Sequence, residues 1–188
     1  MKKKNIVLVA ILALIVLVIV LIVSSYNGLV DTQQTVEEKE STIDVMLTRR
    51  ADLIPNLVNT VKGYAAHEEQ IYTDLANARA KMAGNASVDE KLEANAQLDS
   101  ALSRLLVVVE NYPELKASQQ FIALQDQLEG AENRISTART DYNKAVKEYN
   151  VKIRRFPSNI MAGIFGFEVK EMSEAPESSQ QTPIVDFN

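Results

Sequence analysis

The order of apolar and polar positions divides the chain into one uninterrupted apolar run and a series of amphipathic stretches. From Ile6 to Val23 every side chain is apolar, with no charge and no proline. A helix of about 20 such residues, rising about 1.5 Å per residue, crosses a hydrocarbon core about 30 Å thick. The run therefore predicts a transmembrane helix over residues 6–23, preceded by a short N-terminal segment, residues 1–5.

A cleavable secretory signal is the alternative to a permanent anchor. Signal sequences usually have an apolar region of about 7–15 residues that ends in a small-x-small cleavage site, whereas this run is longer and opens onto Ser24-Ser25-Tyr26-Asn27. We therefore expect the helix to stay attached and to hold the chain in the cell membrane with a single pass. Lys2 to Lys4 precede the run and Asp31 is the first charge after it, which predicts a cytoplasmic N-terminus and an extracytoplasmic remainder. The opposite orientation is the alternative.

Beyond the anchor, apolar residues recur every seven positions and predict that the helix continues to about Arg50. Pro55 is disfavoured deep inside a helix and Asp52 is a good N-cap residue, so we predict a reversing turn at residues 52–53. A kinked continuous helix is the alternative. The seam consists of Leu29, Val36, Ile43, Leu47 and Ile54.

Three further amphipathic stretches predict helices over residues 53–83, 88–109 and 113–156. The second of these follows Ser87, an N-cap candidate that has Glu90 three residues later, as in a capping box. Short connections between amphipathic helices favour antiparallel neighbours. The predicted fold is all-α, with the transmembrane helix continuing into an antiparallel up-and-down four-helix bundle.

The predicted bundle domain covers residues 24–167 and ends in a short apolar segment, residues 157–167. The last helix is much longer than the one before it, so its C-terminal end should return to the bilayer. The segment follows three basic residues within 152–155, and it either lies in the membrane interface or plugs the base of the bundle. Residues 168–188 are rich in Glu, Ser, Gln and Pro and are expected to form a disordered tail.

Charge and composition exclude several classes of function. The chain has 20 basic and 25 acidic residues, a net charge of −5. Without Lys2 to Lys4 the remainder has 17 basic against 25 acidic residues, a net charge of −8, so most of the chain offers no basic surface for nucleic acid. The absence of cysteine excludes disulfides, a lipid-modified cysteine and a thiol nucleophile.

Catalytic and metal-binding motifs are also missing. His67 is the single histidine, whereas a di-iron bundle needs two Glu-x-x-His pairs and a zinc protease needs two histidines one helical turn apart. The sequence has no Gly-x-Ser-x-Gly motif and no glycine-rich phosphate loop. We therefore expect no enzymatic activity, no cofactor and no metal.

Several polar residues fall on the apolar faces of the predicted helices. Buried charges persist when they are paired, so we predict an interhelical contact between Glu68 and Arg139. Such groups either fix the register of the helices or line a ligand site. The set comprises Arg50, Asn56, Lys62, Glu68, Arg79, Asn95, Glu132 and Arg139.

Several short motifs are spread along most of the chain. They are Tyr26-Asn27-x-Leu29-Val30, Arg50-x-Asp52-Leu53-Ile54-Pro55-Asn56-Leu57-Val58, His67-Glu68, Tyr112-Pro113-x-Leu115-Lys116 and Phe156-Pro157. With these motifs the chain resembles the LemA family of bacterial membrane-anchored proteins. This resemblance implies a helical bundle behind an N-terminal membrane helix, and it implies no catalytic activity or cofactor.

These observations favour a non-enzymatic scaffold or adaptor for envelope proteins or for membrane organisation, with the motif Arg50 to Val58 as its docking surface. The expected partners are the lipid bilayer and unidentified membrane or envelope proteins, and the heptad spacing also permits self-association. The alternative is a bundle that senses a small ligand and signals through a separate membrane protein. The candidate structural or docking residues are Arg50, Asp52, Pro55, Asn56, Lys62, Glu68 and Arg139.

Overall fold

The computed structural model describes residues 2–65 and 67–173, and within these ranges it contains helices and no strands. This confirms the predicted all-helical fold. The chain divides into two compact units, one formed by residues up to Glu38 with Tyr142–Met172, and the other by Lys39–Asp141 with Ser173. We call these unit 1 and unit 2. Most of the expected disordered tail, from residue 174 onward, lies outside the described residues.

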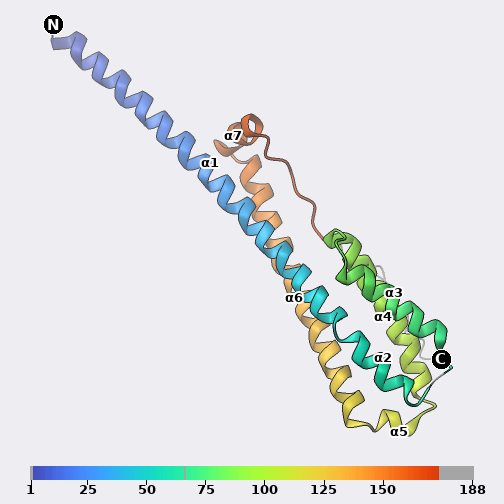
Figure 1. Cartoon of the computed structure of the whole chain (residues 1–188). Helices are drawn as coiled ribbons and strands as arrows, with labels where there is room; N and C mark the ends of the chain where they lie inside the picture. Colours follow the sequence, from blue (N-terminus) through green and yellow to red (C-terminus); the bar gives the residue numbers. More distant parts are fainter. Residues whose placement is uncertain (1, 66, 174–188) are drawn as a thin grey trace, which may run out of the picture. The chain divides into compact units, whose positions relative to one another are not determined.

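Helix α1 runs without interruption over Lys2–Ala51, which confirms that the apolar run continues into the rest of the chain as one helix (Figure 1). No residue of the apolar window is buried, and the large side chains from Ile6 to Val23 are 39–67% exposed. Exposed aliphatic surface of this extent is unfavourable in water. By its length and composition, this part of α1 indicates membrane anchoring.

The chain kinks after α1 and continues into α2, Ile54–Lys62 (Figure 1). Leu53 is helical, with φ −79° and ψ −23°, and the Asp52 N–H donates to the Thr48 carbonyl at 3.0 Å. Pro55 lies in the first turn of α2. Backbone N–H groups in the first turn have no intrahelical acceptor, so a proline there costs the helix no hydrogen bond. The predicted reversing turn at residues 52–53 is therefore wrong, and the kinked helix is correct.

The chain reverses instead at residues 63–68. It returns as α3, Glu69–Ala83, which packs antiparallel to α4, Val88–Val109 (Figure 1). The predicted single helix over residues 53–83 is thus two helices. The apolar spacing is interrupted by His67-Glu68-Glu69-Gln70. These four polar residues fill about one helical turn, so a continuous helix would have no apolar side chain to bury there.

The predicted capping box at the start of α4 is confirmed. The Ser87 hydroxyl accepts from the Glu90 N–H at 3.3 Å, and the Glu90 carboxylate accepts from the Ser87 N–H at 2.9 Å. The backbone N–H of Ser87, and then its hydroxyl, lower the pKa of Glu90 by stabilising the ionised carboxylate.

The predicted helix over residues 113–156 is also divided in the structure. Pro113–Lys116 forms the one-turn helix α5, and Gln119–Arg154 forms the long helix α6. The Ser118 N–H bonds to the Leu115 carbonyl at 2.9 Å, a tight turn that ends α5 before α6 begins. The long amphipathic pattern was correct, but its first turn belongs to a separate helix.

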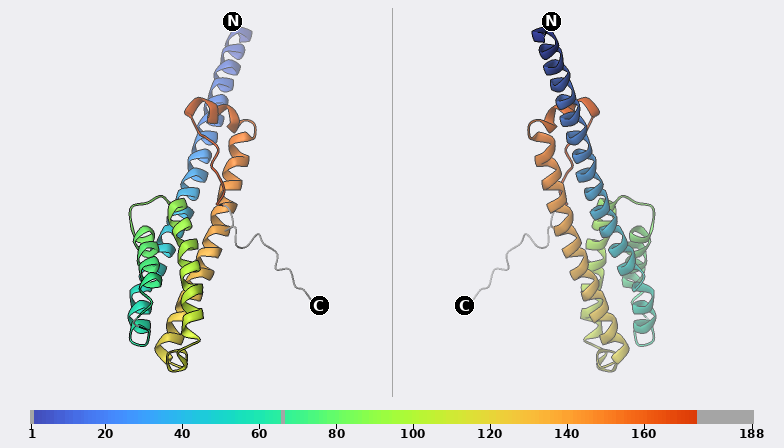
Figure 2. Two further views of the ribbon diagram at one scale, coloured as in Figure 1. Left: turned by 90° about the vertical axis from the view of Figure 1, so that its right-hand side faces the viewer. Right: turned by 90° about the vertical axis from the view of Figure 1, so that its left-hand side faces the viewer.

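Each unit has its own core. In unit 1, Leu29 and Val36 of α1 pack with residues of α6 and with Ala162 of α7, Ser158–Phe165 (Figure 2). In unit 2, α2, α3 and α4 pack with the last turns of α1 and the first part of α6. The largest fully buried side chains of unit 2 are Ile43, Leu47, Ile54, Leu57, Leu75, Met82, Leu98, Leu105, Leu115 and Phe121.

Candidate functional site

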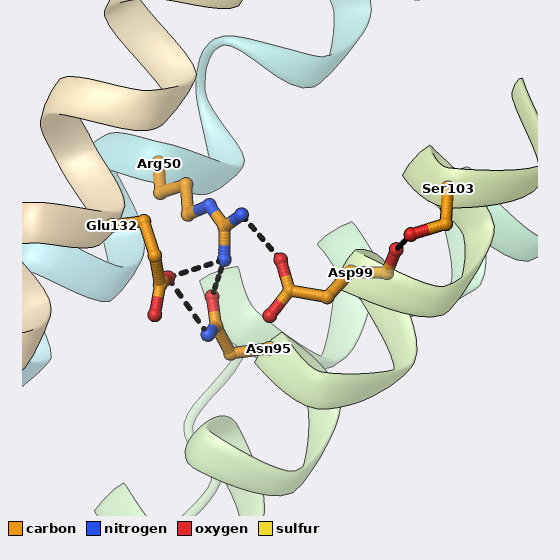
Figure 3. A network of polar contacts seen from close by, with 5 residues as sticks. All are labelled: Arg50, Asn95, Asp99, Ser103 and Glu132. Atoms are coloured by element: carbon orange, nitrogen blue, oxygen red, sulfur yellow. Dashed lines mark hydrogen bonds and ion pairs between the residues drawn. The ribbon is translucent and has the colours of Figure 1, made fainter. Parts of the chain in front are cut away.

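A buried arginine links three helices of unit 2 (Figure 3). Arg50, near the end of α1, is 3% exposed. Its Nη1 donates to Asn95 Oδ1 of α4 at 2.5 Å and to Glu132 Oε2 of α6 at 2.7 Å. Its Nη2 donates to Asp99 Oδ1 of α4 at 2.5 Å, and Asn95 Nδ2 donates to Glu132 Oε2 at 3.2 Å. A guanidinium presents donors in a planar fork, so one side chain can bind both neighbouring helices at once.

The network carries two carboxylates for one cation. The side chains of Asp99 and Glu132 are 45% and 36% exposed, so water solvates their excess negative charge, whereas the guanidinium is enclosed. Arg50 Nε is buried and has no hydrogen-bond partner among the described residues. A buried cation is costly unless it is paired. The two ion pairs therefore hold α1, α4 and α6 in one register.

A pocket of about 310 Å³ opens beside this network, between α2, α4 and α6. Arg50 and Glu132 form part of its polar wall, and Leu106, which is 43% exposed, contributes to its apolar wall. The pocket thus combines an apolar surface with charged groups on one wall. The other lining residues are Leu57, Leu102, Leu105, Phe121, Gln125, Leu128 and Glu129.

The predicted contact between Glu68 and Arg139 is wrong. Glu68 lies just before α3, at the end of the antiparallel pair where α4 finishes and the chain turns into α6. Arg139 lies 20 residues beyond Gln119, or about 30 Å along α6. Its Nε donates to the Ser173 hydroxyl at 3.2 Å. Among the described residues, the buried cations that form ion pairs are Arg50, with Asp99 and Glu132, and Lys91, with Asp44.

The remaining candidate residues lie along the kink and α2. Asp52, Asn56 and Lys62 are exposed, and Pro55 is half-buried. Ile54 and Leu57 are buried, so the face of the Arg50 to Val58 motif that carries its arginine and large apolar residues points into unit 2. The sequence identified Arg50, Asn95 and Glu132 as polar residues on apolar faces, but it missed Asp99, which follows Leu98 at the edge of the stripe and looks like an ordinary surface residue.

Tyr72 of α3 gives unit 2 a sensitivity to high pH. Its hydroxyl donates to the Ala65 carbonyl, and its ring lies 5.1 Å from Lys62 Nζ. Burial, followed by the charges of Glu68 and Tyr112, raises the pKa of Tyr72 above its usual value of about 10. Because the folded state favours the neutral phenol, this contribution to stability is present below about pH 10 and is lost as the pH rises further.

We predict that Tyr72→Phe lowers the free energy of unfolding by about 1 kcal/mol at pH 7, because it removes the hydrogen bond to Ala65. The wild-type melting temperature, followed by circular dichroism in detergent, should fall above pH 10. The variant should show a smaller fall over the same interval. An equal alkaline decline in both proteins would exclude Tyr72 as the titrating group.

A second group of residues lies in unit 1, where the apolar run ends. The Ser25 hydroxyl of α1 donates to the Ser158 hydroxyl of α7 at 3.1 Å. The ring centroid of Tyr26 lies 4.7 Å from that of Phe165 and 5.9 Å from that of Phe167. Aromatic side chains at the end of a membrane helix are typical of the water–lipid interface. These contacts place α7 at the level where α1 would leave the bilayer.

Helix α7 has two different faces. Ala162 is 5% exposed and packs in the core of unit 1, as a plug would. Ile160, Ile164 and Phe165 are 48%, 66% and 54% exposed. The buried Ala162 agrees with the interpretation of residues 157–167 as a plug, and their position in a membrane interface stays a prediction.

The described residues define an all-helical protein whose long N-terminal apolar helix indicates membrane anchoring. A sequence model of the LemA family matches residues 39–187, so the chain belongs to the LemA family. The match includes residues 168–187, which the motif resemblance leaves out.

Three relatives illustrate the similarity. The chain is 29% identical to "Magnetosome protein MamQ 2" of Paramagnetospirillum magneticum over 186 residues, covering 85% of this chain and 68% of the relative. It is 27% identical to "Magnetosome protein MamQ" of Magnetospirillum gryphiswaldense, with the same two coverages. It is also 27% identical to "Protein LemA" of Metamycoplasma hominis over 138 residues, covering 72% of this chain and 63% of the relative.

Proposed function

We propose that the chain is a non-enzymatic, single-pass membrane protein whose unit 2 acts as a scaffold or adaptor for envelope proteins or membrane organisation. The observation that carries this proposal is the pocket between α2, α4 and α6. Its lining includes four leucines besides Leu106, together with Phe121, and Leu106 is 43% exposed. Exposed apolar surface of this kind is typical of protein-binding sites.

The chemistry of the pocket defines the partner that would fit. Its leucines and Phe121 would bury apolar side chains, while Glu129 and Glu132 would favour a positive charge nearby. An amphipathic helix with a basic residue beside its apolar stripe has this combination. In this proposal the docking surface is the pocket, and the exposed Asp52 and Asn56 of the Arg50 to Val58 motif lie outside its lining.

Photo-crosslinking in cells tests the scaffold role. A photoreactive amino acid replaces Leu106 in the pocket, and in a matched variant it replaces Ala96, an exposed residue of the same helix that does not line the pocket. We expect a discrete crosslinked protein from position 106 and none from position 96. If neither position captures a protein, and a detergent extract also yields no partner, the scaffold role is excluded.

A ligand-sensing bundle is the second candidate function. The pocket volume of about 310 Å³ lies at the lower end of the range for small-molecule sites, and Arg50 gives it one buried cation. A thermal-shift screen of metabolites against the full chain in detergent tests this candidate. Reproducible stabilisation by one compound, abolished by a bulky substitution at Leu106, would favour sensing over scaffolding.

The proposal includes an orientation, with residues 1–5 in the cytoplasm and unit 2 outside. Because the chain has no cysteine, Ser100→Cys on the exposed side of α4 introduces a unique thiol. A membrane-impermeant maleimide should label this variant in intact cells. Labelling that appears only after lysis would reverse the orientation and with it the compartment of the partners.

A further inference from the structure

The chain as a whole is acidic, but the C-terminal end of α6 is strongly basic. Residues 144–155 contain five basic residues and one acidic residue, Glu148. Within unit 1 this end of α6 lies beside α1 just past the apolar run, as the contact between Ser25 and Ser158 shows. Lys152, Arg154 and Arg155 therefore lie near the level where phospholipid headgroups would surround α1, and Lys144 and Lys147 lie farther along α6.

Four of these residues line a pocket of about 730 Å³ in unit 1. They are Lys144, Lys147, Lys152 and Arg155. Glu148 is the one carboxylate among the described lining residues. The remaining lining residues are Thr32, Val151, Phe156, Pro157 and Ser158.

The four cations have no ion pair with any residue in the described ranges. Two cations elsewhere in the described residues are paired with carboxylates. Lys91 Nζ lies 2.5 Å from Asp44 Oδ1, and the half-buried Lys170 lies 3.9 Å from Glu37. Four basic residues against the one carboxylate of Glu148 leave an excess of positive charge in this pocket, which favours the binding of an external anion.

A second pocket, of about 880 Å³, adjoins the first at Lys152, Pro157 and Ser158. Its other wall includes Ile19, Val20, Leu21 and Val23 from the last apolar turns of the run, and it also contains Ser25 and Asp31. Lys152 therefore lines both pockets, the basic one and the one that includes the end of the apolar run of α1. This pairing of a cationic site with an aliphatic wall matches a molecule that has both an anionic head and acyl chains.

Gly28 of α1 makes room for Lys152. A Cβ atom built on Gly28 would lie 2.8 Å from Lys152 Nζ and 3.1 Å from its Cε. The ammonium group thus lies against the helix backbone, between the two pockets. Alanine at position 28 would suit a helix better than glycine but would displace this ammonium.

We propose that these two pockets form a binding site for one anionic glycerophospholipid. Its phosphate binds Lys152, with Lys144, Lys147 and Arg155 around the headgroup, and its acyl chains lie against Ile19–Val23. A free phosphate would satisfy the basic pocket alone, whereas the adjoining aliphatic wall selects the lipid. This inference rests on the membrane tether of the proposed function and adds a lipid preference to it.

Native mass spectrometry of the full chain tests the site. The protein is placed in nanodiscs of phosphatidylcholine mixed with phosphatidylglycerol, and the lipids retained after release are counted. Wild type should retain one phosphatidylglycerol in preference to phosphatidylcholine. Lys152→Gln should weaken this retention about fivefold, the effect of one basic residue near an anionic surface.

Two variants separate the site from general effects. Arg154→Gln removes the same charge two residues away, at a position that does not line either pocket, and should leave the retention nearly unchanged. Gly28→Ala displaces only the flexible end of the Lys152 side chain and should reduce the retention by less than Lys152→Gln does, while circular dichroism shows the helical content to be intact. This second variant keeps the test decisive even where Lys152→Gln folds poorly.

Three outcomes would overturn the inference. If the wild-type protein enters nanodiscs but does not prefer phosphatidylglycerol, the site does not exist. If Lys152→Gln and Arg154→Gln lose lipid retention equally, the effect comes from unspecific charge. Displacement of the lipid by inorganic phosphate would show that the aliphatic wall contributes nothing. Failure of the tether is a separate result, because the protein would then not enter the nanodiscs at all.

Discussion

Replacing Arg50 with methionine is expected to lower the free energy of unfolding by about 3 kcal/mol. Removing one partner of a buried ion pair typically costs about 3–5 kcal/mol. Here the value lies at the lower end, because the orphaned Asp99 and Glu132 are 45% and 36% exposed and can be rehydrated. Thermal unfolding of the full chain in detergent, followed by circular dichroism, measures the loss.

The neighbouring arginine provides the matched control. Arg49 is exposed, so Arg49→Met removes the same charge with a change within about 0.5 kcal/mol. Adding Asp99→Asn and Glu132→Gln to Arg50→Met removes the carboxylates that the first substitution orphaned, and should recover part of the loss. Equal stability of Arg49→Met and Arg50→Met would contradict the assigned role of the network.

Tyr149→Ala is expected to have an effect at least as large, confined to unit 1. The Tyr149 side chain is 1% exposed and packs with Leu29, Val36 and Ile153 in that core. Truncating a buried aromatic ring to alanine leaves a cavity and costs about 3–5 kcal/mol. Hydrogen exchange measured by mass spectrometry should show faster exchange over Tyr142–Phe165 and little change over α3 and α4.

Tyr149→Phe is the control for the ring itself. It keeps the buried aromatic surface and should change the stability by less than about 1 kcal/mol. Burial, then the charges of Glu168 and Glu37, raise the pKa of Tyr149, so this variant should also resist high pH slightly better than wild type. Unchanged protection of α7 in Tyr149→Ala would show that this core does not hold α7 in place.

The heptad seam shows which part of the fold can be predicted from the sequence. Leu29, Val36, Ile43 and Leu47 are all fully buried, because residues spaced by seven return to the same face of a long helix. The capping box at Ser87 was equally predictable, since its hydrogen bonds join residues only three positions apart. Local signals of this kind depend little on how distant segments meet.

The pairing of charges depends on distant segments, and there the sequence was insufficient. The position of Glu68 along the bundle depends on where the chain reverses. A reversal at residues 52–53 would place Glu68 partway along the returning helix, whereas the observed reversal at 63–68 places it at the start of that helix. Proline is disfavoured in the middle of a helix but not in its first turn, so Pro55 alone cannot distinguish a kink from a turn. Once the reversal was misplaced, the partner predicted for Arg139 was wrong and the partners of Arg50 were not predicted.

The meeting of the C-terminal end of α6 with α1 was partly predictable. The length of the amphipathic pattern over α6 predicted that its end reaches back to the end of the apolar run, and Ser158 lies beside Ser25, whereas the return to the bilayer itself stays a prediction. The gathering of Lys144, Lys147, Lys152 and Arg155 around one pocket required the structure, because composition averages them with the acidic residues elsewhere.

The central claim is that the apolar N-terminal helix stays attached and tethers the chain to a membrane. Intact-mass analysis of the native protein, after cell fractionation and a carbonate wash, tests it most directly. We predict that the protein remains in the washed membranes with its N-terminal residues present and a mass near 20.9 kDa. A freely soluble protein that lacks residues 1–23 would contradict the account.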